Sequence, residues 1–164
     1  MTAIYIDADA CPVRDEIFRV ATRLQVPVFV VSNGSRPIRA PGLPNVEMVI
    51  VPAGADAADD WIAERIGAAD VCTTADIPLA SRCLERGARA LAFNGREWTG
   101  DNIGSALAGR AIGQHLRESG VQTGGPAALT QRDRGSFLNA LDRLVQAARR
   151  GPRVTASLRA HDID

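Results

Sequence analysis

Short apolar runs alternate with longer segments of helical periodicity along most of the chain. The runs are rich in Val, Ile and Ala and are mostly continuous, which is typical of strands covered on both faces in a parallel sheet. Between them, apolar residues recur at spacings of three and four, as on one face of a helix. The pattern predicts five strands, at 3–6, 27–32, 46–51, 70–74 and 88–93.

Five segments carry the periodicity or the end signals of helices. Pro12 suits a first helical turn, and Asp15 in the same turn favours the positive end of the helix dipole. Thr130 and Asp133 resemble a capping box, followed by a long apolar stripe. The predicted helices are 12–25, 56–66, 78–87, 101–120 and 130–151, of which 101–120 is interrupted by glycines.

Alternating strands and helices predict an α/β protein with right-handed crossovers and helices on both faces of the sheet. The length of 164 residues suits one domain. We expect this domain over 1–150, followed by a flexible, arginine-containing tail over 151–164. No run approaches the roughly 20 apolar residues of a membrane span, and no secretory signal begins the chain. We expect a cytoplasmic protein without a membrane partner, and the sequence leaves an oligomer open.

Charge is zero in total but uneven along the chain. Residues 1–76 hold eleven acidic residues and six arginines, whereas residues 77–164 hold eight and thirteen. This uneven distribution is consistent with a metal site beside an anion-binding surface. It is equally consistent with a chance distribution of charges on solvated helix faces. The zero net charge gives no attraction of the whole molecule to nucleic acid.

The chain has no lysine, which excludes a P-loop lysine, Schiff-base chemistry and a lysine general base. The cysteines, Cys11, Cys72 and Cys83, form no C-x-x-C pair and predict no disulfide framework. With His115 and His161 as the only histidines, a zinc site has few ligands to draw on. Carboxylates remain the main candidates for chemistry.

Polar residues follow the predicted strands where each one ends. In an open parallel sheet, ligands bind beyond the carboxyl ends of the strands, near the point where strand order reverses. Carboxylates that converge there repel one another unless a cation lies among them, and Mg²⁺ or Mn²⁺ prefers such oxygen ligands. The residues at these ends are Asp7, Asp9, Ser32, Asn33, Asp56, Asp59, Asp60, Thr73, Thr74, Asp76 and Asn94.

Structural roles compete with the metal at several of these positions. Asp76 is a good N-cap for the helix after it, and Asp56 with Asp59 suits an N-cap and a first-turn acid. Asp7 differs because it ends an apolar strand, where a carboxylate without a partner is costly. Together the positions favour a metal site built from Asp7, Asp9 and Asp76.

Five segments carry a resemblance to a known family: DADACPV at 7–13, GADAADDWI at 54–62, TTADIPLA at 73–80, GGP at 124–126 and DRGSFLNALDR at 133–143. Over about residues 3–150 the chain resembles the YaiI/YqxD family, a group of bacterial proteins placed within the PIN-like nuclease superfamily. The resemblance implies a PIN-like three-layer α/β/α fold around a mainly parallel, five-stranded sheet, and an acidic metal site.

PIN nucleases carry an Asp after the first strand, an acid on a middle helix and a Thr-x-Asp after the fourth strand. Asp7 matches the first of these, Asp59 or Asp60 the second, and Thr74 with Asp76 the third. A further acid often follows two to four residues later in that superfamily.

Residues 78–80 hold no acid at that place, and Asp9 is a candidate to substitute for it from across the site. Our leading hypothesis is a divalent-metal-dependent phosphodiesterase that acts on RNA. Asp7, Asp9 and Asp76 would bind Mg²⁺ or Mn²⁺, and an acid of the middle helix would hold a second ion or orient water. The expected catalytic residues are Asp7, Asp9, Asp59, Asp60 and Asp76.

The predicted contacts to substrate are hydroxyl or amide groups on phosphate oxygens and arginines on the RNA backbone. They are Ser32, Asn33, Arg36, Arg39, Thr74, Arg132 and Arg134. An alternative hypothesis is a non-catalytic PIN-like module that binds RNA, a nucleotide or a protein partner at the same place. A third is a haloacid-dehalogenase-like phosphatase, which YIDADA and VVSNG resemble, but the absence of lysine ranks it last.

Overall fold

The computed structural model describes the chain except residues 9–10, 35–37, 53, 55, 119–127 and 152–164, and it describes 110–118 by their backbone alone. The GGP motif at 124–126 and nearly all of the predicted tail therefore lie outside the described residues. None of the described helices is long and apolar enough to cross a membrane.

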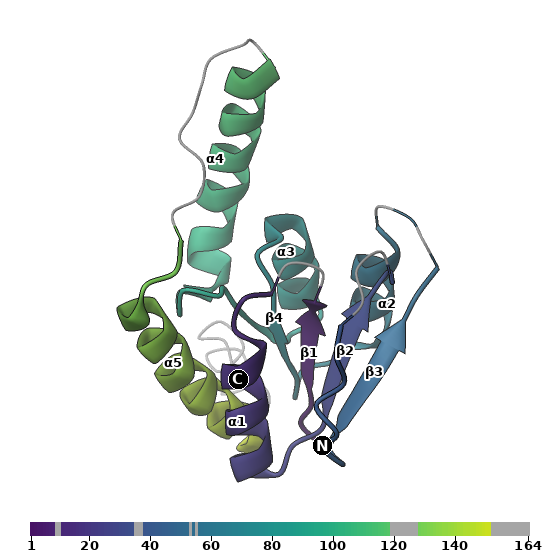
Figure 1. The fold of residues 1–164 in the computed structure, drawn as a ribbon. Helices are drawn as coiled ribbons and strands as arrows, with labels where there is room; N and C mark the ends of the chain where they lie inside the picture. Colours follow the sequence, from purple (N-terminus) through teal and green to yellow (C-terminus); the bar gives the residue numbers. More distant parts are fainter. Residues whose placement is uncertain (9–10, 35–37, 53, 55, 119–127, 152–164) are drawn as a thin grey trace, which may run out of the picture.

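One sheet forms the centre of the molecule, with the strand order β3-β2-β1-β4-β5-β6 (Figure 1). The five predicted strands are present and run parallel to their neighbours. They are β1 (Ile4–Asp7), β2 (Val28–Ser32), β3 (Val46–Ile50), β4 (Val71–Thr73) and β5 (Arg89–Leu91). The mainly parallel α/β architecture predicted from the sequence is thus confirmed.

The predicted number of strands was wrong, because a sixth strand, β6 (Glu97–Trp98), pairs antiparallel with β5. A strand of two residues is too short to show any periodicity. Between β5 and β6 the chain turns at Gly95, whose φ is +94°. A Cβ there would approach the carbonyl carbon of Ser136 to 2.8 Å, so the turn lies directly against the C-terminal helix.

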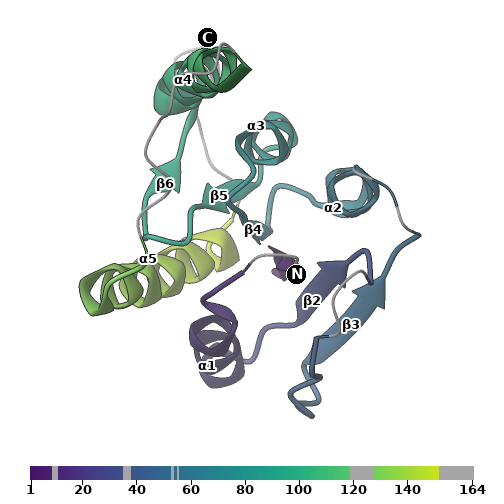
Figure 2. The same cartoon turned by 45° about the horizontal axis from the view of Figure 1, so that its top comes forward.

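Helices cover both faces of the sheet (Figure 2). The described residues form α1 (Arg14–Leu24), α2 (Ala57–Arg65), α3 (Ile77–Glu85), α4 (Gly100–Glu118) and α5 (Gln131–Arg149). Apolar residues of α1 and α5 pack on one face, in one core cluster with strand residues such as Ile4 and Ile6. Those of α2 and α3 pack on the other face, around Tyr5 and Cys72. The three layers follow from the alternating directions of side chains along each strand.

The glycine-containing helix α4 is continuous, and it extends beyond the sheet in Figure 1. Its first turns contact the body of the protein through Ile103 and Ala106, which pack with Trp98 and Ala80. Two caps predicted from the sequence are present. Thr130 begins α5 with a complete capping box, and Asp76 caps α3.

Strand order reverses between β1 and β4. From β1 the chain adds β2 and β3 on one side, and it then returns to add β4 and β5 on the other. The carboxyl ends of β1 and β4 therefore lie at the position in the sheet where α/β proteins commonly bind ligands. Asp7 is the last residue of β1, and Thr74 directly follows β4.

Candidate functional site

A chain of hydrogen bonds joins the ends of β1 and β4. The hydroxyl of Thr74 donates to Oδ2 of Asp7 at 3.0 Å, and its oxygen accepts the backbone N–H of Asp76 at 2.9 Å. The Thr74 side chain is fully buried, whereas Asp7 and Asp76 are half-buried. A threonine hydroxyl has one proton to donate, and here Asp7 accepts it. This hydrogen bond orients the Asp7 carboxylate.

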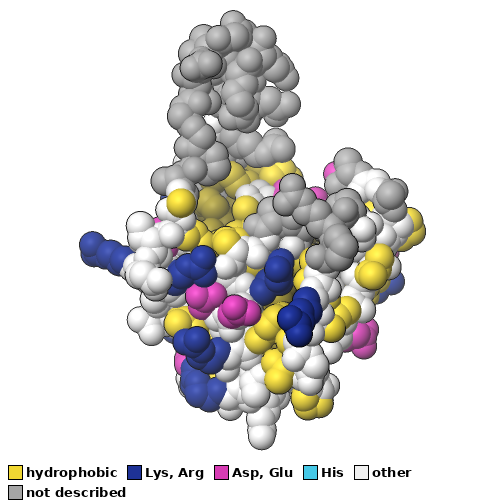
Figure 3. Space-filling view, in the orientation of Figure 1, with side chains coloured by type: hydrophobic (Ala, Val, Ile, Leu, Met, Phe, Trp, Pro, Cys, Tyr) yellow, Lys and Arg dark blue, Asp and Glu magenta, His cyan; other side chains and the backbone are white. Residues whose placement is uncertain are grey.

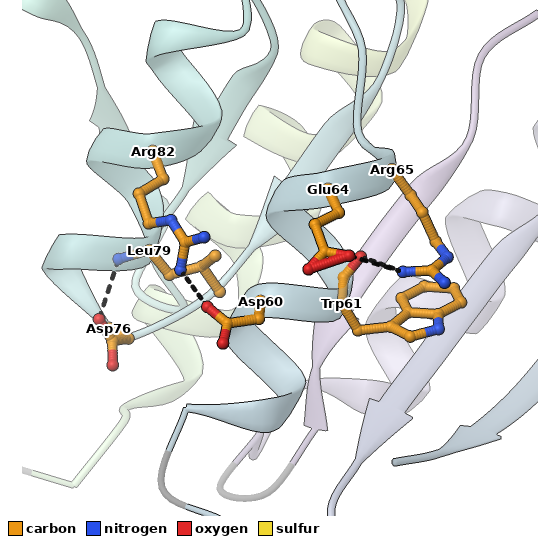
Figure 4. A network of polar contacts seen from close by, with 7 residues as sticks. All are labelled: Asp60, Trp61, Glu64, Arg65, Asp76, Leu79 and Arg82. Atoms are coloured by element: carbon orange, nitrogen blue, oxygen red, sulfur yellow. Dashed lines mark hydrogen bonds and ion pairs between the residues drawn. The ribbon is translucent and has the colours of Figure 1, made fainter.

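Asp76 serves two purposes at the start of α3. One of its carboxylate oxygens, Oδ1, accepts the N–H of Leu79 at 3.0 Å and so caps the helix (Figure 4). The carboxylate also contacts Asp59 of α2 through a side-chain hydrogen bond. Asp76 thus confirms the predicted cap and still lies among the other acids.

Asp59 is the most perturbed acid of the described chain. Burial, the charges of Asp76, Asp7 and Asp56, and a hydrogen bond that protonated Asp59 donates to Asp76 together raise the pKa of Asp59 from 3.8 to about 7. At neutral pH this carboxyl group is therefore partly protonated. The shift shows that Asp76 and Asp7, which come from two other segments, lie near enough to Asp59 to disfavour its charged form.

Asp60 faces a different environment from Asp59. Its Oδ1 accepts a hydrogen bond from Nη1 of Arg82 on α3 at 2.8 Å, and both side chains are about half exposed. Figure 4 shows Asp60 directed toward Arg82. The sequence left Asp59 and Asp60 as alternatives, and only Asp59 lies with Asp7 and Asp76.

The fit of these acids to a metal ion can be tested on their chemistry. Asp7, Asp59 and Asp76 offer oxygen ligands only, yet the described residues contain no group of three acidic, His or Cys side chains set to hold a metal ion. Mg²⁺ is commonly bound by one or two carboxylates, with water and substrate phosphates in its other positions. The donor set therefore fits Mg²⁺ or Mn²⁺ bound in this way, and it does not fit a four-ligand zinc site.

The predicted substrate contacts are spread over several elements. Ser32, at the end of β2, is buried and its Oγ accepts the N–H of Gly34 at 3.0 Å, while the adjacent Asn33 is half-buried. Arg39 is exposed and has no hydrogen bond or ion pair with any residue that the structure describes. Two predicted site residues, Asp9 and Arg36, lie outside the described residues.

The two arginines of α5 differ from each other. Arg132 is exposed. Arg134 instead ties α5 to the start of α1, because its Nη1 donates to the carbonyl of Pro12 at 3.0 Å and lies 3.1 Å from a carboxylate oxygen of Glu16. Its contacts in the structure are thus those of an arginine that fixes two helices together.

One residue near the site was missed at the level of the sequence. Arg14 is the first residue of α1 and lines a hollow together with Arg39. Its position directly after the DADACPV segment is the sequence feature that could have marked it as a candidate. Cys11, beside it, is buried, and burial raises the pKa of its thiol to about 12, so it has no thiolate character at neutral pH.

Comparison with known proteins matches this chain to one family. The family described as "Uncharacterized BCR, YaiI/YqxD family" matches residues 5–147. A "UPF0178 protein" of Caulobacter sp. (strain K31) is 56% identical over 150 residues, which cover 92% of this chain and 98% of the relative. A "UPF0178 protein" of Rhodospirillum rubrum is 52% identical over 148 residues, 90% of this chain and 98% of the relative. No solved structure matches the chain. The chain belongs to the YaiI/YqxD family.

Proposed function

We propose that this chain is a divalent-metal-dependent phosphodiesterase that acts on RNA, built on a PIN-like fold. The observation that supports the proposal is the crowding of Asp7, Asp59 and Asp76 at the reversal of strand order, where the pKa of Asp59 is raised to about 7. A carboxyl group in such surroundings stays neutral or gains a cation. A bound Mg²⁺ or Mn²⁺ would supply the cation.

The residues have separate roles in this proposal. Asp7 and Asp76 would hold the ion, with Asp9 as a third ligand predicted from the sequence. Thr74 keeps the Asp7 carboxylate aimed into the site through its 3.0 Å hydrogen bond. We assign the role of the acid on the middle helix to Asp59, because Asp60 is paired with Arg82.

When bound, such an ion lowers the pKa of a coordinated water and stabilises the charge that develops on a phosphate. The chain itself contributes the orientation of the acids and a buried hydroxyl that holds them in place. Exposed arginines, Arg39 and Arg132 among the described residues, would contact the RNA backbone. The expected compartment stays the cytoplasm, a prediction that rests on the sequence.

A second candidate function is a module that binds RNA, a nucleotide or a protein partner at the same site without turnover. The observation that favours it is that the described residues contain no set of three ligands ready for a metal. The lack of an acid at residues 78–80 points the same way.

The test combines metal binding with cleavage. Mn²⁺ is titrated into the full chain by calorimetry, and cleavage of a labelled RNA is followed for the wild type, Asp7→Asn and Asp76→Asn. Asparagine caps a helix about as well as aspartate, so Asp76→Asn keeps the start of α3. Asp60→Asn is the matched control, because Asp60 lies one residue from Asp59 and outside the cluster.

We expect Mn²⁺-dependent cleavage by the wild type and by Asp60→Asn, and its loss in the other two variants. Equal cleavage by all four proteins would contradict the proposal. Binding of Mn²⁺ that depends on Asp7 and Asp76, without any cleavage, would favour the second candidate.

A further inference from the structure

Two hollows lie side by side on the face of the sheet that carries α1. The first has a volume of about 430 Å³ and is lined by Arg14, Asp15 and Phe18 of α1 and by residues 39–42. The second has a volume of about 450 Å³, and its lining includes Val30 and Ser32 of β2 and Met48 and Ile50 of β3. Ala40 lines both hollows, so the two adjoin at this residue.

The first hollow is suited to an anion. Arg14 is half-buried, and its one hydrogen bond among the described residues is a long one, 3.5 Å, to the carbonyl of Cys11. Arg39 is exposed and has no partner in the described part of the chain. One carboxylate, that of Asp15, lines the same hollow, so two guanidinium groups face one acid. A phosphate can accept paired hydrogen bonds from such guanidinium groups.

The second hollow is mainly apolar and has one directed polar group. Ile50 is 74% exposed, which is unusual for a large aliphatic side chain, and Met48 and Ile38 are half-buried beside it. Ser32 is only 5% exposed. Its Oγ accepts the N–H of Gly34, and among the described residues no hydrogen bond donated by its hydroxyl proton is found.

The two surfaces are complementary to the two parts of a nucleotide. In Figure 3, arginine side chains lie beside hydrophobic ones on the face that carries α1. A planar base has apolar faces and polar edges, which match an aliphatic hollow with a single hydroxyl. Its phosphate matches the hollow with Arg14 and Arg39. Because the chain has few aromatic residues, the base would meet aliphatic walls rather than stacked rings.

The location links these hollows to the acids. Asp7 of β1 pairs with Val31 of β2, and Ser32 is the next residue of β2. Cys11 lies within the electrostatic influence of both Arg14 and Asp7. The end of β2 that lines the second hollow is therefore adjacent to the end of β1 that carries Asp7.

We propose that the two hollows bind one nucleotide of the RNA strand, with its phosphate at Arg14 and Arg39 and its base against Met48 and Ile50. The identification of the strand as RNA rests on the proposed function. The binding of a nucleotide does not require cleavage, and it can therefore be tested by itself.

The experiment uses the full chain in EDTA, so that no metal ion contributes. AMP, inorganic phosphate and adenosine are titrated separately and followed by NMR chemical shifts. AMP engages both hollows and is expected to bind more tightly than either of the other probes. Arg39→Ala and Arg14→Ala each remove a charged hydrogen-bond donor, which should weaken AMP and phosphate about tenfold and leave adenosine unchanged.

Ile50→Ser tests the other hollow. Ile50 is largely exposed, so the variant keeps the fold, and it should weaken AMP and adenosine several-fold while phosphate is unaffected. Arg19→Ala is the matched control for the arginines, because Arg19 is exposed on the same helix and lines neither hollow. It should leave all three affinities unchanged.

The inference is overturned if none of the probes binds, if AMP binds no better than phosphate, or if the variants bind AMP like the wild type. Failure of the proposed function gives a different result. RNA would then stay intact, while AMP binding still followed the pattern of the variants. Conversely, cleavage that depends on Asp7, with AMP affinity and KM unchanged in Arg39→Ala and Ile50→Ser, would leave the function standing and remove this nucleotide site.

Discussion

Asp59 and Asp60 are adjacent in the chain and lie in opposite surroundings. Asp59 is half-buried among Asp76, Asp7 and Asp56, and its pKa is raised to about 7. Asp60 is exposed and pairs with Arg82 at 2.8 Å. Successive residues of a helix point about 100° apart, so α2 places one acid beside Asp76 and Asp7 and the other on the surface, beside Arg82.

This difference separates two kinds of acid in one protein. The charge of Asp60 is compensated within the fold by Arg82, so no bound cation is needed to balance it. Asp59 faces other carboxylates, and its charged form is disfavoured until a proton or a cation arrives. Four experiments test this account, beginning with the one that should have the largest effect.

Asp59→Asn and Asp60→Asn compare the two acids directly. If a cation relieves the crowding around Asp59, Asp59→Asn should weaken Mn²⁺ binding by about tenfold or more, since a carboxylate near the ion is lost. Asp60→Asn should leave it within a factor of two or so, because its charge is screened and already paired. Calorimetric titration at pH 7.5 or so measures both. Equal losses in the two variants would remove the distinction.

Thr74→Val removes the hydroxyl that joins Asp7 to Asp76. The hydroxyl is fully buried, and without it the N–H of Asp76 and the Asp7 carboxylate each lose a partner. We expect the free energy of unfolding to fall by about 1–3 kcal/mol, measured by urea denaturation. Thr74→Ser keeps the hydroxyl and is the control. A stable Thr74→Val protein would show that these bonds contribute little.

The raised pKa of Asp59 predicts a dependence of stability on pH. Between pH 3.8 and about 7 the folded chain binds the proton of Asp59 more tightly than the unfolded chain does. The contribution of Asp59 to the free energy of unfolding therefore falls as pH rises through this window. Solvent at the half-exposed site screens the effect, so Asp59→Asn should stabilise the metal-free protein at pH 8 by about 1–2 kcal/mol.

Urea denaturation of wild type and Asp59→Asn at pH 5 and at pH 8 measures this contribution. The variant should show a smaller loss between the two pH values, and the gap should close when Mn²⁺ is added to the wild type. If the two proteins lose equal stability, the acids do not crowd Asp59 in solution.

The smallest effect is expected on the exposed side of α2. Asp60→Ala and Arg82→Ala break an ion pair whose side chains are about half exposed. Such pairs contribute about 0–1 kcal/mol, so melting temperatures should change little. A loss as large as that of Thr74→Val would mean that the α2–α3 surface is as important to the fold as the buried hydrogen bonds.

Much of this architecture could be predicted from the sequence, because it is encoded locally. Periodicity predicted each of the five described helices and the five parallel strands, and local cap signals predicted the roles of Thr130 and Asp76. The strand β6 was missed because two residues cannot establish a pattern. Its antiparallel pairing depends on the turn at Gly95 against α5.

The site was less predictable, because its geometry depends on how the elements rotate on the sheet. Both Asp59 and Asp60 lie in the first turn of α2, and only the packing of that helix decides which one faces Asp7. The partner of Arg134 is Glu16, which is 118 residues away in the chain. No local pattern distinguishes such an arginine from an exposed one like Arg132.

The most direct test of the central claim is a crystal of the wild type soaked in Mn²⁺ and measured for anomalous scattering. We predict a peak between the carboxylates of Asp7 and Asp76, with Asp59 facing it, and no peak at Asp60. A crystal soaked at a high concentration of Mn²⁺ that shows no peak between these carboxylates would contradict the metal site. A structure in which arginine side chains neutralise Asp7 and Asp76 would contradict it as well.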